Sequence, residues 1–128
     1  MTLFWKINTS LAALYGAICV GGAAALMHLW QSSLTGNQMA VLLSAGFILT
    51  LHSLALLALG AAENLQQQSP WLSRLVAVAF HLGSCGFVFT LVGGVFGWSL
   101  HFGQLAPLSG QLLILSWLLL AFSPWIRK

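Results

Sequence analysis

Four histidines carry most of the chemistry that this sequence could perform: His28, His52, His81 and His101. Acidic partners for them are almost absent, because Glu63 is the one acidic residue of the chain. The sequence therefore lacks a carboxylate pair for acid–base catalysis and a Ser-His-Asp set. Its two cysteines do not form the C-x-x-C motif of metal and redox sites. We predict no catalytic residue and no metal site, and we expect a protein that is not an enzyme.

His52 and His81 form the pair with the most specific candidate use. Counted from the cytoplasmic ends of the apolar segments that hold them, both lie about 12–14 Å deep at 1.5 Å per residue. Two neutral imidazoles at one depth on different helices could serve as axial ligands of a b-type haem. However, no Lys or Arg lies deep enough to pair with the haem propionates. The alternative is a neutral hydrogen bond between helices, with Ser53 or Cys85 as the partner of His52.

The other two histidines lie near the outer boundary of the predicted membrane domain. His28 follows Gly21 by two helical turns, so it shares a helix face with small residues of the same segment. We expect this face to point into the bundle. His101 falls in a connection between apolar segments, where contact with solvent or lipid headgroups is the ordinary role.

Long apolar helices must position these residues, because the composition is too apolar for a soluble domain. Of the 128 residues, 59% are hydrophobic and 4% are charged, whereas about a quarter of the residues in soluble domains are charged. A spanning helix needs about 20 apolar residues, and backbone in lipid must satisfy its own hydrogen bonds. Four segments meet these conditions: about 9–30, 38–61, 73–97 and 108–125. The chain is predicted to be a single all-α membrane domain, a four-transmembrane-helix bundle.

The few charges predict the orientation in the membrane. Lys6, Arg74 and the Arg127–Lys128 tail fall on one side of the four predicted spans. Short loops rich in Lys and Arg stay on the cytoplasmic side, so both termini are expected there. A signal peptide cleaved near residues 23–25 would leave three spans and termini on opposite sides, which the charges disfavour. The charges are also too sparse and scattered for a nucleic-acid surface.

Small residues at four-residue spacing predict close helix packing. In the first segment these are Ala13, Ala17, Gly21 and Ala25, and in the third they are Gly86, Thr90, Gly94 and the G-x-x-x-G pair Gly93 and Gly97. Such seams serve as interfaces within a compact bundle or with another membrane chain. Trp117 lies inside the last span and is expected to pack between helices.

Three stretches give the chain a family resemblance. LYGAICVGGAAALMHL (14–29) ends a glycine- and alanine-rich helix with a histidine, and SAGFILTLHSLALLALG (44–60) holds a histidine followed by Ser-Leu-Ala. LAPLSGQLLILSWLLLAF (105–122) keeps the proline, a glycine and the tryptophan of a third motif. In these blocks the chain resembles domain-of-unknown-function family 423, small four-helix membrane proteins whose animal members are called transmembrane protein 256. The matching residues are His28, His52, Ser53, Pro107, Gly110 and Trp117.

The resemblance implies a four-helix bundle in a bacterial inner or mitochondrial membrane, and it brings no established reaction. Ala106 and Ser109 stand where the family motif has Thr and Gly, and His81 is not a family position. We expect a multi-pass protein of the bacterial inner (cell) membrane.

Three functions stay open on the sequence. The first is a structural or accessory subunit without a cofactor, which packs through its glycine and alanine seams against other membrane proteins or a second copy within the lipid bilayer. The second is an electron-transfer protein that binds haem b through His52 and His81. The third is a small-molecule or proton transporter, suggested by a discontinuity at Pro107 and by the buried histidines. The first is favoured, because low charge and short loops leave little else to bind with.

Overall fold

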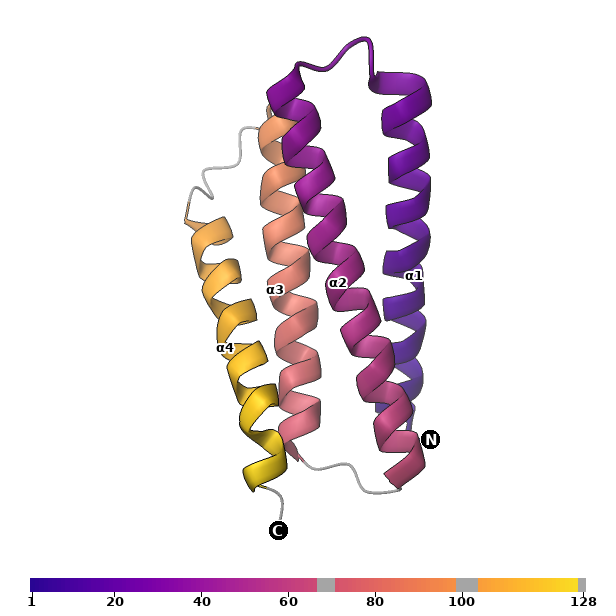
Figure 1. Ribbon diagram of the computed structural model, residues 1–128, viewed down its shortest axis with the longest axis vertical. Coiled ribbons are helices and arrows are strands. Elements are labelled where there is room, and N and C mark those ends of the chain that lie inside the picture. Colours follow the sequence, from indigo (N-terminus) through magenta and orange to yellow (C-terminus); the bar gives the residue numbers. More distant parts are fainter. Residues whose placement is uncertain (67–70, 99–103, 127–128) are drawn as a thin grey trace.

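Four long helices make up the protein, whose computed structural model describes residues 1–66, 71–98 and 104–126 (Figure 1). The helices are α1 (Leu3–Ala25), continued by the π-helical turn η1 (Leu26–Trp30), α2 (Gly36–Gln66), α3 (Trp71–Val95) and α4 (Leu105–Ile126). These ranges contain no strand. Each of the four helices is long and apolar enough to cross a membrane, as expected of an all-α, multi-pass membrane protein.

Three of the four helices are longer than the apolar segments from which they were predicted, whereas α3 has the predicted length and begins and ends two residues earlier. α1 begins at Leu3 rather than near residue 9, and α2 continues to Gln66 rather than ending near residue 61. Apolar length reports the thickness of the hydrocarbon layer, whereas a helix continues into the headgroup region as long as its residues favour it. Glu63 and Gln66 belong to the good helix formers, so α2 extends through them.

A capping box fixes the start of α2. The Thr35 hydroxyl accepts a hydrogen bond from the Gln38 backbone N–H at 3.2 Å, and the Gln38 side-chain oxygen accepts one from the Thr35 N–H at 2.9 Å. This reciprocal pair satisfies two backbone donors at the helix end. The capping box therefore determines where the connection after η1 ends and α2 begins.

Pro107 lies in the first turn of α4 and does not interrupt it. The first N–H groups of any helix have no partner within that helix, so a proline at this place removes no hydrogen bond. α4 continues from Leu105 through Pro107 to Ile126. The discontinuity expected at Pro107, which suggested a transporter, is therefore not present in the structure.

The G-x-x-x-G pair of α3 forms the helix end rather than a seam between helices. Gly97 has φ +67°, a conformation that favours glycine, and the Trp98 N–H donates to the Gly93 carbonyl at 2.9 Å. This is the Schellman pattern of a helix C-terminus. Gly93 lies under the Trp98 ring, because a Cβ added to Gly93 would approach Trp98 Cε3 to 3.0 Å. Gly93 and Gly97 are thus four residues apart because both belong to this cap, whereas the sequence predicted that they pack against another helix.

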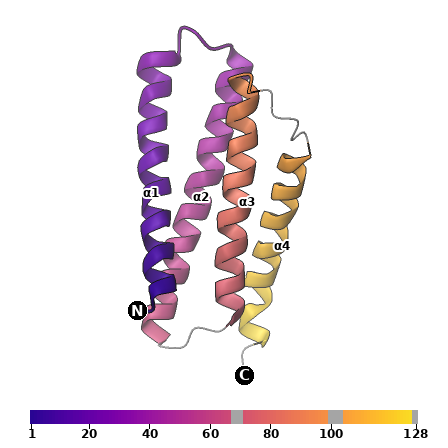
Figure 2. The same ribbon diagram turned by 180° about the vertical axis from the view of Figure 1, so that it is seen from behind.

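Each helix packs against the next one along the chain, from α1 through α4. Figures 1 and 2 show that α1 begins and α4 ends at the same end of the molecule. The approach of α3 to α4 is especially close at Gly83, where an added Cβ would lie 2.6 Å from Leu113 Cδ2 and 3.3 Å from the Ser109 carbonyl oxygen. A larger residue there would force the Leu113 side chain or the two helices to shift.

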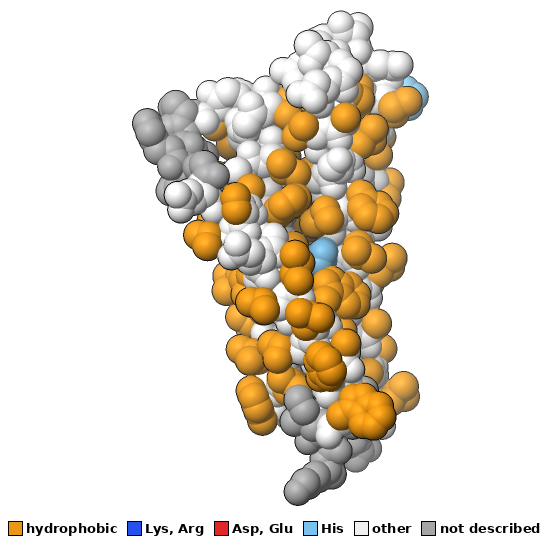
Figure 3. All heavy atoms as spheres, turned by 60° about the vertical axis from the view of Figure 1, so that its left-hand side comes forward, with side chains coloured by type: hydrophobic (Ala, Val, Ile, Leu, Met, Phe, Trp, Pro, Cys, Tyr) orange, Lys and Arg blue, Asp and Glu red, His pale blue; other side chains and the backbone are white. Residues whose placement is uncertain are grey.

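The core gathers inward-facing residues from all four helices, and the outside is apolar as well. The buried cluster consists of Trp5, Ala12, Tyr15, Leu49, Leu56, Leu59, Val76, Ala77, Phe80 and Leu113. Large hydrophobic side chains are exposed on every helix, and Figure 3 shows them along most of the height of one face. A surface of this kind is suited to lipid, where exposed apolar residues have no cost.

Candidate functional site

A chain of hydrogen bonds between side chains joins α1 to α3 in the interior. His81 Nε2 lies 3.1 Å from Asn8 Oδ1, and His81 Nδ1 lies 2.9 Å from the Tyr15 hydroxyl. The Tyr15 hydroxyl is also 3.2 Å from the Cys85 thiol, and Asn8 Nδ2 donates to the Leu56 carbonyl of α2 at 2.9 Å. We call these four side chains, Asn8, Tyr15, His81 and Cys85, the α1–α3 relay.

One arrangement of protons satisfies the whole relay. The Asn8 side-chain oxygen can only accept, so His81 Nε2 carries the proton and donates to it. His81 Nδ1 then accepts from the Tyr15 hydroxyl, whose oxygen in turn accepts from the Cys85 S–H. Asn8 and Tyr15 are buried, with exposed fractions of 2% and 9%, whereas Cys85 is exposed at the end of the relay. The relay therefore ends in a thiol that faces outward from the core.

His52 makes a second, separate contact between helices. Its Nδ1 donates to the Ile48 carbonyl at 2.7 Å, and its Nε2 accepts from the Trp117 indole N–H of α4 at 3.1 Å. The imidazole lies beside Phe80, with ring centroids 5.1 Å apart, and Phe80 also lies 5.1 Å from the Trp117 ring. Only 2% of His52 is exposed. The ring is thus enclosed by an aromatic cluster between α2, α3 and α4.

The partners proposed for His52 from the sequence have other bonds. Ser53 donates to the Ala12 carbonyl of α1 at 2.6 Å, and Cys85 belongs to the relay. The neutral imidazole of His52 therefore contacts a neighbouring helix through Trp117 rather than through Ser53 or Cys85.

The geometry does not favour haem ligation by His52 and His81. His52 bonds toward α4, whereas His81 bonds toward α1, so the two rings turn to different helices. Each ring uses both nitrogens in hydrogen bonds, which binding to iron would have to break. Within the part of the chain that the structure describes, no group of three or more His, Cys, Asp or Glu side chains could hold a metal ion.

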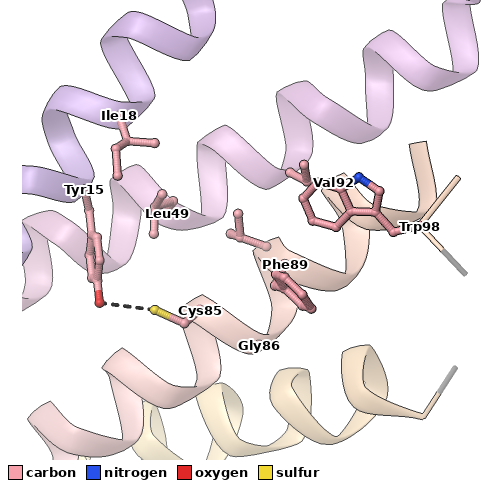
Figure 4. A pocket seen from close by; sticks show the side chains of 9 residues that line it. Tyr15, Ile18, Leu49, Cys85, Gly86, Phe89, Val92 and Trp98 are labelled. Carbon is pink, nitrogen blue, oxygen red and sulfur yellow. Dashed lines mark hydrogen bonds between the residues drawn. The ribbon is translucent and has the colours of Figure 1, made fainter. Parts of the chain in front are cut away.

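An apolar crevice opens beside the end of the relay (Figure 4). Its volume is about 740 Å³, and Tyr15 and Cys85 lie at one end of it. The other lining residues come from α1, α2, α3 and the turn that follows α3: Ile18, Leu49, Gly86, Val88, Phe89, Val92 and Trp98. The crevice combines a large apolar wall with one hydroxyl and one thiol.

Three small residues of the predicted α1 seam, Ala13, Ala17 and Gly21, lie on the outward face of the helix, whereas the fourth, Ala25, is partly buried. Ser10, Ala13, Ala17, Gly21, Ala24 and His28 are all exposed. Apart from its own helix, no described atom lies within 4 Å of a Cβ added to Gly21. The helix instead turns Trp5, Asn8, Ala12 and Tyr15 inward. The expectation that His28 points into the bundle is therefore wrong, although it does share a face with the small residues. We call this surface the outward α1 face.

The remaining glycines, cysteines and histidine singled out in the sequence lie in different places. Gly86 lies against Ser109 of α4, Gly110 lies against Phe87 of α3, and Gly94 faces open space. Cys19 and Cys85 are free thiols, and Cys19 lies 3.5 Å from the Gly46 carbonyl of α2. His101 falls outside the described residues.

The sequence reasoning missed Asn8 and Tyr15, the α1 half of the relay. Their spacing carried a signal, because two helical turns separate them and place both on the face of Ala12. Tyr15 lies inside the predicted span of about 9–30 and Asn8 directly precedes it. A polar face shared by two such residues predicts a polar contact with a neighbouring helix.

No protein-family model, no curated protein and no solved structure matches this chain. The resemblance to family 423 stays a prediction from the three sequence blocks.

Proposed function

We propose that this chain is a non-enzymatic accessory subunit, which docks the outward α1 face onto a helix of another membrane protein. The observation that carries the proposal is a row of exposed small residues on one face of the helix: Ser10, Ala13, Ala17, Gly21 and Ala24. The row extends about 21 Å along the helix at 1.5 Å per residue. Small side chains let two helix backbones approach closely, and the resulting van der Waals contact drives association in lipid.

The fold of the subunit does not depend on this face. α1 is held from its other side by the bond from Asn8 to the Leu56 carbonyl and by the bond from Ser53 to the Ala12 carbonyl. Tyr15 adds its bond to His81 of α3. A side chain enlarged on the outward α1 face therefore leaves the internal contacts in place, and its effect falls on the docking partner.

The cellular setting is part of the same proposal. The protein belongs in the bacterial inner membrane, with both termini in the cytoplasm. Lys6 and Arg74 support this orientation, since both lie at the end of the molecule where α1 begins: the Arg74 guanidinium is 5.8 Å from the centre of the Phe4 ring. Positive charge marks the cytoplasmic end of a short membrane protein.

Site-specific photo-crosslinking in the native membrane tests the docking. A photoreactive amino acid at Ala17 should give one adduct of defined mass, and the same amino acid at Val78, exposed on α3, should give none. Gly21→Leu should abolish the adduct because the larger side chain separates the helices. Gly94→Leu is the matched control, since both glycines face open space.

The adduct mass identifies the partner as a second copy or as another protein. A yield at Ala17 no higher than at Val78 would refute the docking face, and so would an adduct that survives Gly21→Leu.

A further inference from the structure

We propose that the crevice beside the relay binds an isoprenoid quinone or a close chemical relative. Such a ligand is a neutral, membrane-soluble molecule with a flat ring that carries oxygen atoms and a long apolar tail. Its ring oxygen would meet Tyr15 and Cys85 at one end of the crevice, and its tail would lie along the apolar wall toward Phe89 and Trp98 (Figure 4). This site is separate from the outward α1 face, so it does not rest on the docking proposal.

The size and the lining of the crevice fit this chemistry. Pockets for small molecules have volumes of about 300–1,000 Å³, with mostly apolar walls and a few polar groups that orient the ligand. The crevice, at about 740 Å³, lies in this range. Aromatic rings at both ends, those of Tyr15, Phe89 and Trp98, offer flat faces to a planar ring.

The two polar groups can serve both the oxidised and the reduced ring. The Cys85 thiol lies 3.2 Å from the Tyr15 oxygen, and its S–H can rotate to a quinone carbonyl. The Tyr15 oxygen has two lone pairs, so it can accept from a ring hydroxyl while its own proton stays on the bond to His81 Nδ1. The relay behind Tyr15 holds the hydroxyl in place for this contact.

The depth of the polar pair excludes lipids with an ionic headgroup. Tyr15 lies about 18 Å along α1 from its first residue, and Cys85 about 21 Å along α3, at 1.5 Å per residue. Both are thus near the middle of a hydrocarbon layer about 30 Å thick, whereas phospholipid headgroups stay at its surfaces. A quinone ring is weakly polar and can enter the hydrocarbon.

The uncharged lining of the crevice disfavours an ionised fatty acid for a related reason. None of the nine residues described as lining it carries a charge. An ionised carboxylate in this place would have no cation beside it, and an unpaired charge in an apolar site is costly. The ligand should therefore be neutral.

Retention of decylubiquinone by the immobilised, full-length protein in mild detergent tests the site. We expect saturable binding near one molecule per chain, which Ile18→Trp abolishes by filling the crevice. Ile114→Trp is the matched control, because both isoleucines are exposed and Ile114 lies on α4, away from the crevice. Cys85→Ala should weaken binding about three- to tenfold, the loss of one ordinary hydrogen bond.

The comparison compounds decide the chemistry. Lauric acid and 1-decanol should bind at least tenfold more weakly than decylubiquinone. Equal binding of decanol would show a groove for any alkyl chain and would overturn the proposal, as would equal retention by Ile18→Trp and Ile114→Trp. Gly21→Leu should leave quinone binding unchanged, so that failure of the docking proposal and failure of this one can be told apart.

Discussion

His52 is tolerated inside an apolar span because its ring accepts a hydrogen bond from the Trp117 indole of a neighbouring helix. The Trp117 indole can only donate, and His52 Nε2 accepts its proton at 3.1 Å while Nδ1 donates to the Ile48 carbonyl. Only the neutral ring has one donor and one acceptor nitrogen. The contact therefore defines the protonation of His52 as well as its orientation.

Replacing His52 by Leu should lower the stability of the protein in detergent, because the Trp117 N–H then loses its acceptor. Hydrogen bonds between membrane helices contribute about 0.6 kcal/mol on average and up to about 1.7 kcal/mol. We expect a coupling of this size between His52→Leu and Trp117→Phe in a double-mutant cycle of denaturant unfolding. His52→Leu with Phe122→Leu, exposed on the same helix as Trp117, should be additive. Additivity of the first pair would contradict the assigned bond.

The sequence marks residues such as His52 and Trp117 without showing which of them meet. A polar side chain inside a span signals that it needs a partner, but any helix at the right depth can supply one. The partner depends on how far each helix is rotated about its axis, and His52 reaches Trp117 rather than Ser53 for this reason. Residue types were therefore predictable in the site, whereas their pairing was not.

At the scale of the elements, helix α1 shows why the inward face of a membrane helix is hard to predict. Its inward residues Ala12 and Tyr15 and its outward residues Ala17 and Gly21 do not differ clearly in hydrophobicity, because lipid is as apolar as a protein core. The four helices themselves were predictable from apolar length, since the bilayer sets a minimum of about 20 residues. The rotation of α1 was not predictable from hydrophobicity, and only the polar residues Asn8 and Tyr15 indicated it.

Gly83 should tolerate substitution far less well than Gly94 on the same helix. An alanine Cβ at Gly83 would lie 2.6 Å from Leu113 Cδ2, so the Leu113 side chain or the helices α3 and α4 would have to shift. Overpacking of this kind costs about 1–3 kcal/mol. Gly94→Ala meets open space and should be neutral or stabilising, as alanine favours a helix. Thermal unfolding of both variants in detergent checks this, and equal midpoints would show that the α3–α4 contact is looser than described.

At the scale of the whole molecule, an even number of spans returns the chain to the side from which it started. α1 begins and α4 ends at one end (Figures 1 and 2). This arrangement was predictable from the number of apolar segments and from where the turns fall. Which end faces the cytoplasm is a separate matter, for which the few charges provide the argument.

Tags placed before Met1 and after Lys128 should both be protected from a protease added to spheroplasts, whose outer membrane has been opened. Exchange of the charges should reverse this: Lys6→Gln, Arg74→Gln, Arg127→Gln and Lys128→Gln, combined with Ser32→Lys and Ser33→Lys in the opposite connection, should expose both tags in a large part of the molecules. Protection unaffected by the exchange would mean that something other than positive charge determines the orientation.

The packing of each helix against its successor also sets the order in which the protein can be assembled during synthesis. Once α2 has entered the membrane, two hydrogen bonds between α1 and α2 can form: Asn8 donates to the Leu56 carbonyl, and the Ser53 hydroxyl donates to the Ala12 carbonyl. Tyr15 must wait for His81, and His52 must wait for Trp117. A ribosome that stops after the first hairpin would therefore leave the Tyr15 phenol without His81 and the His52 imidazole with its bond to the Ile48 carbonyl alone. We expect membrane quality control to recognise such an incomplete chain until α3 and α4 arrive.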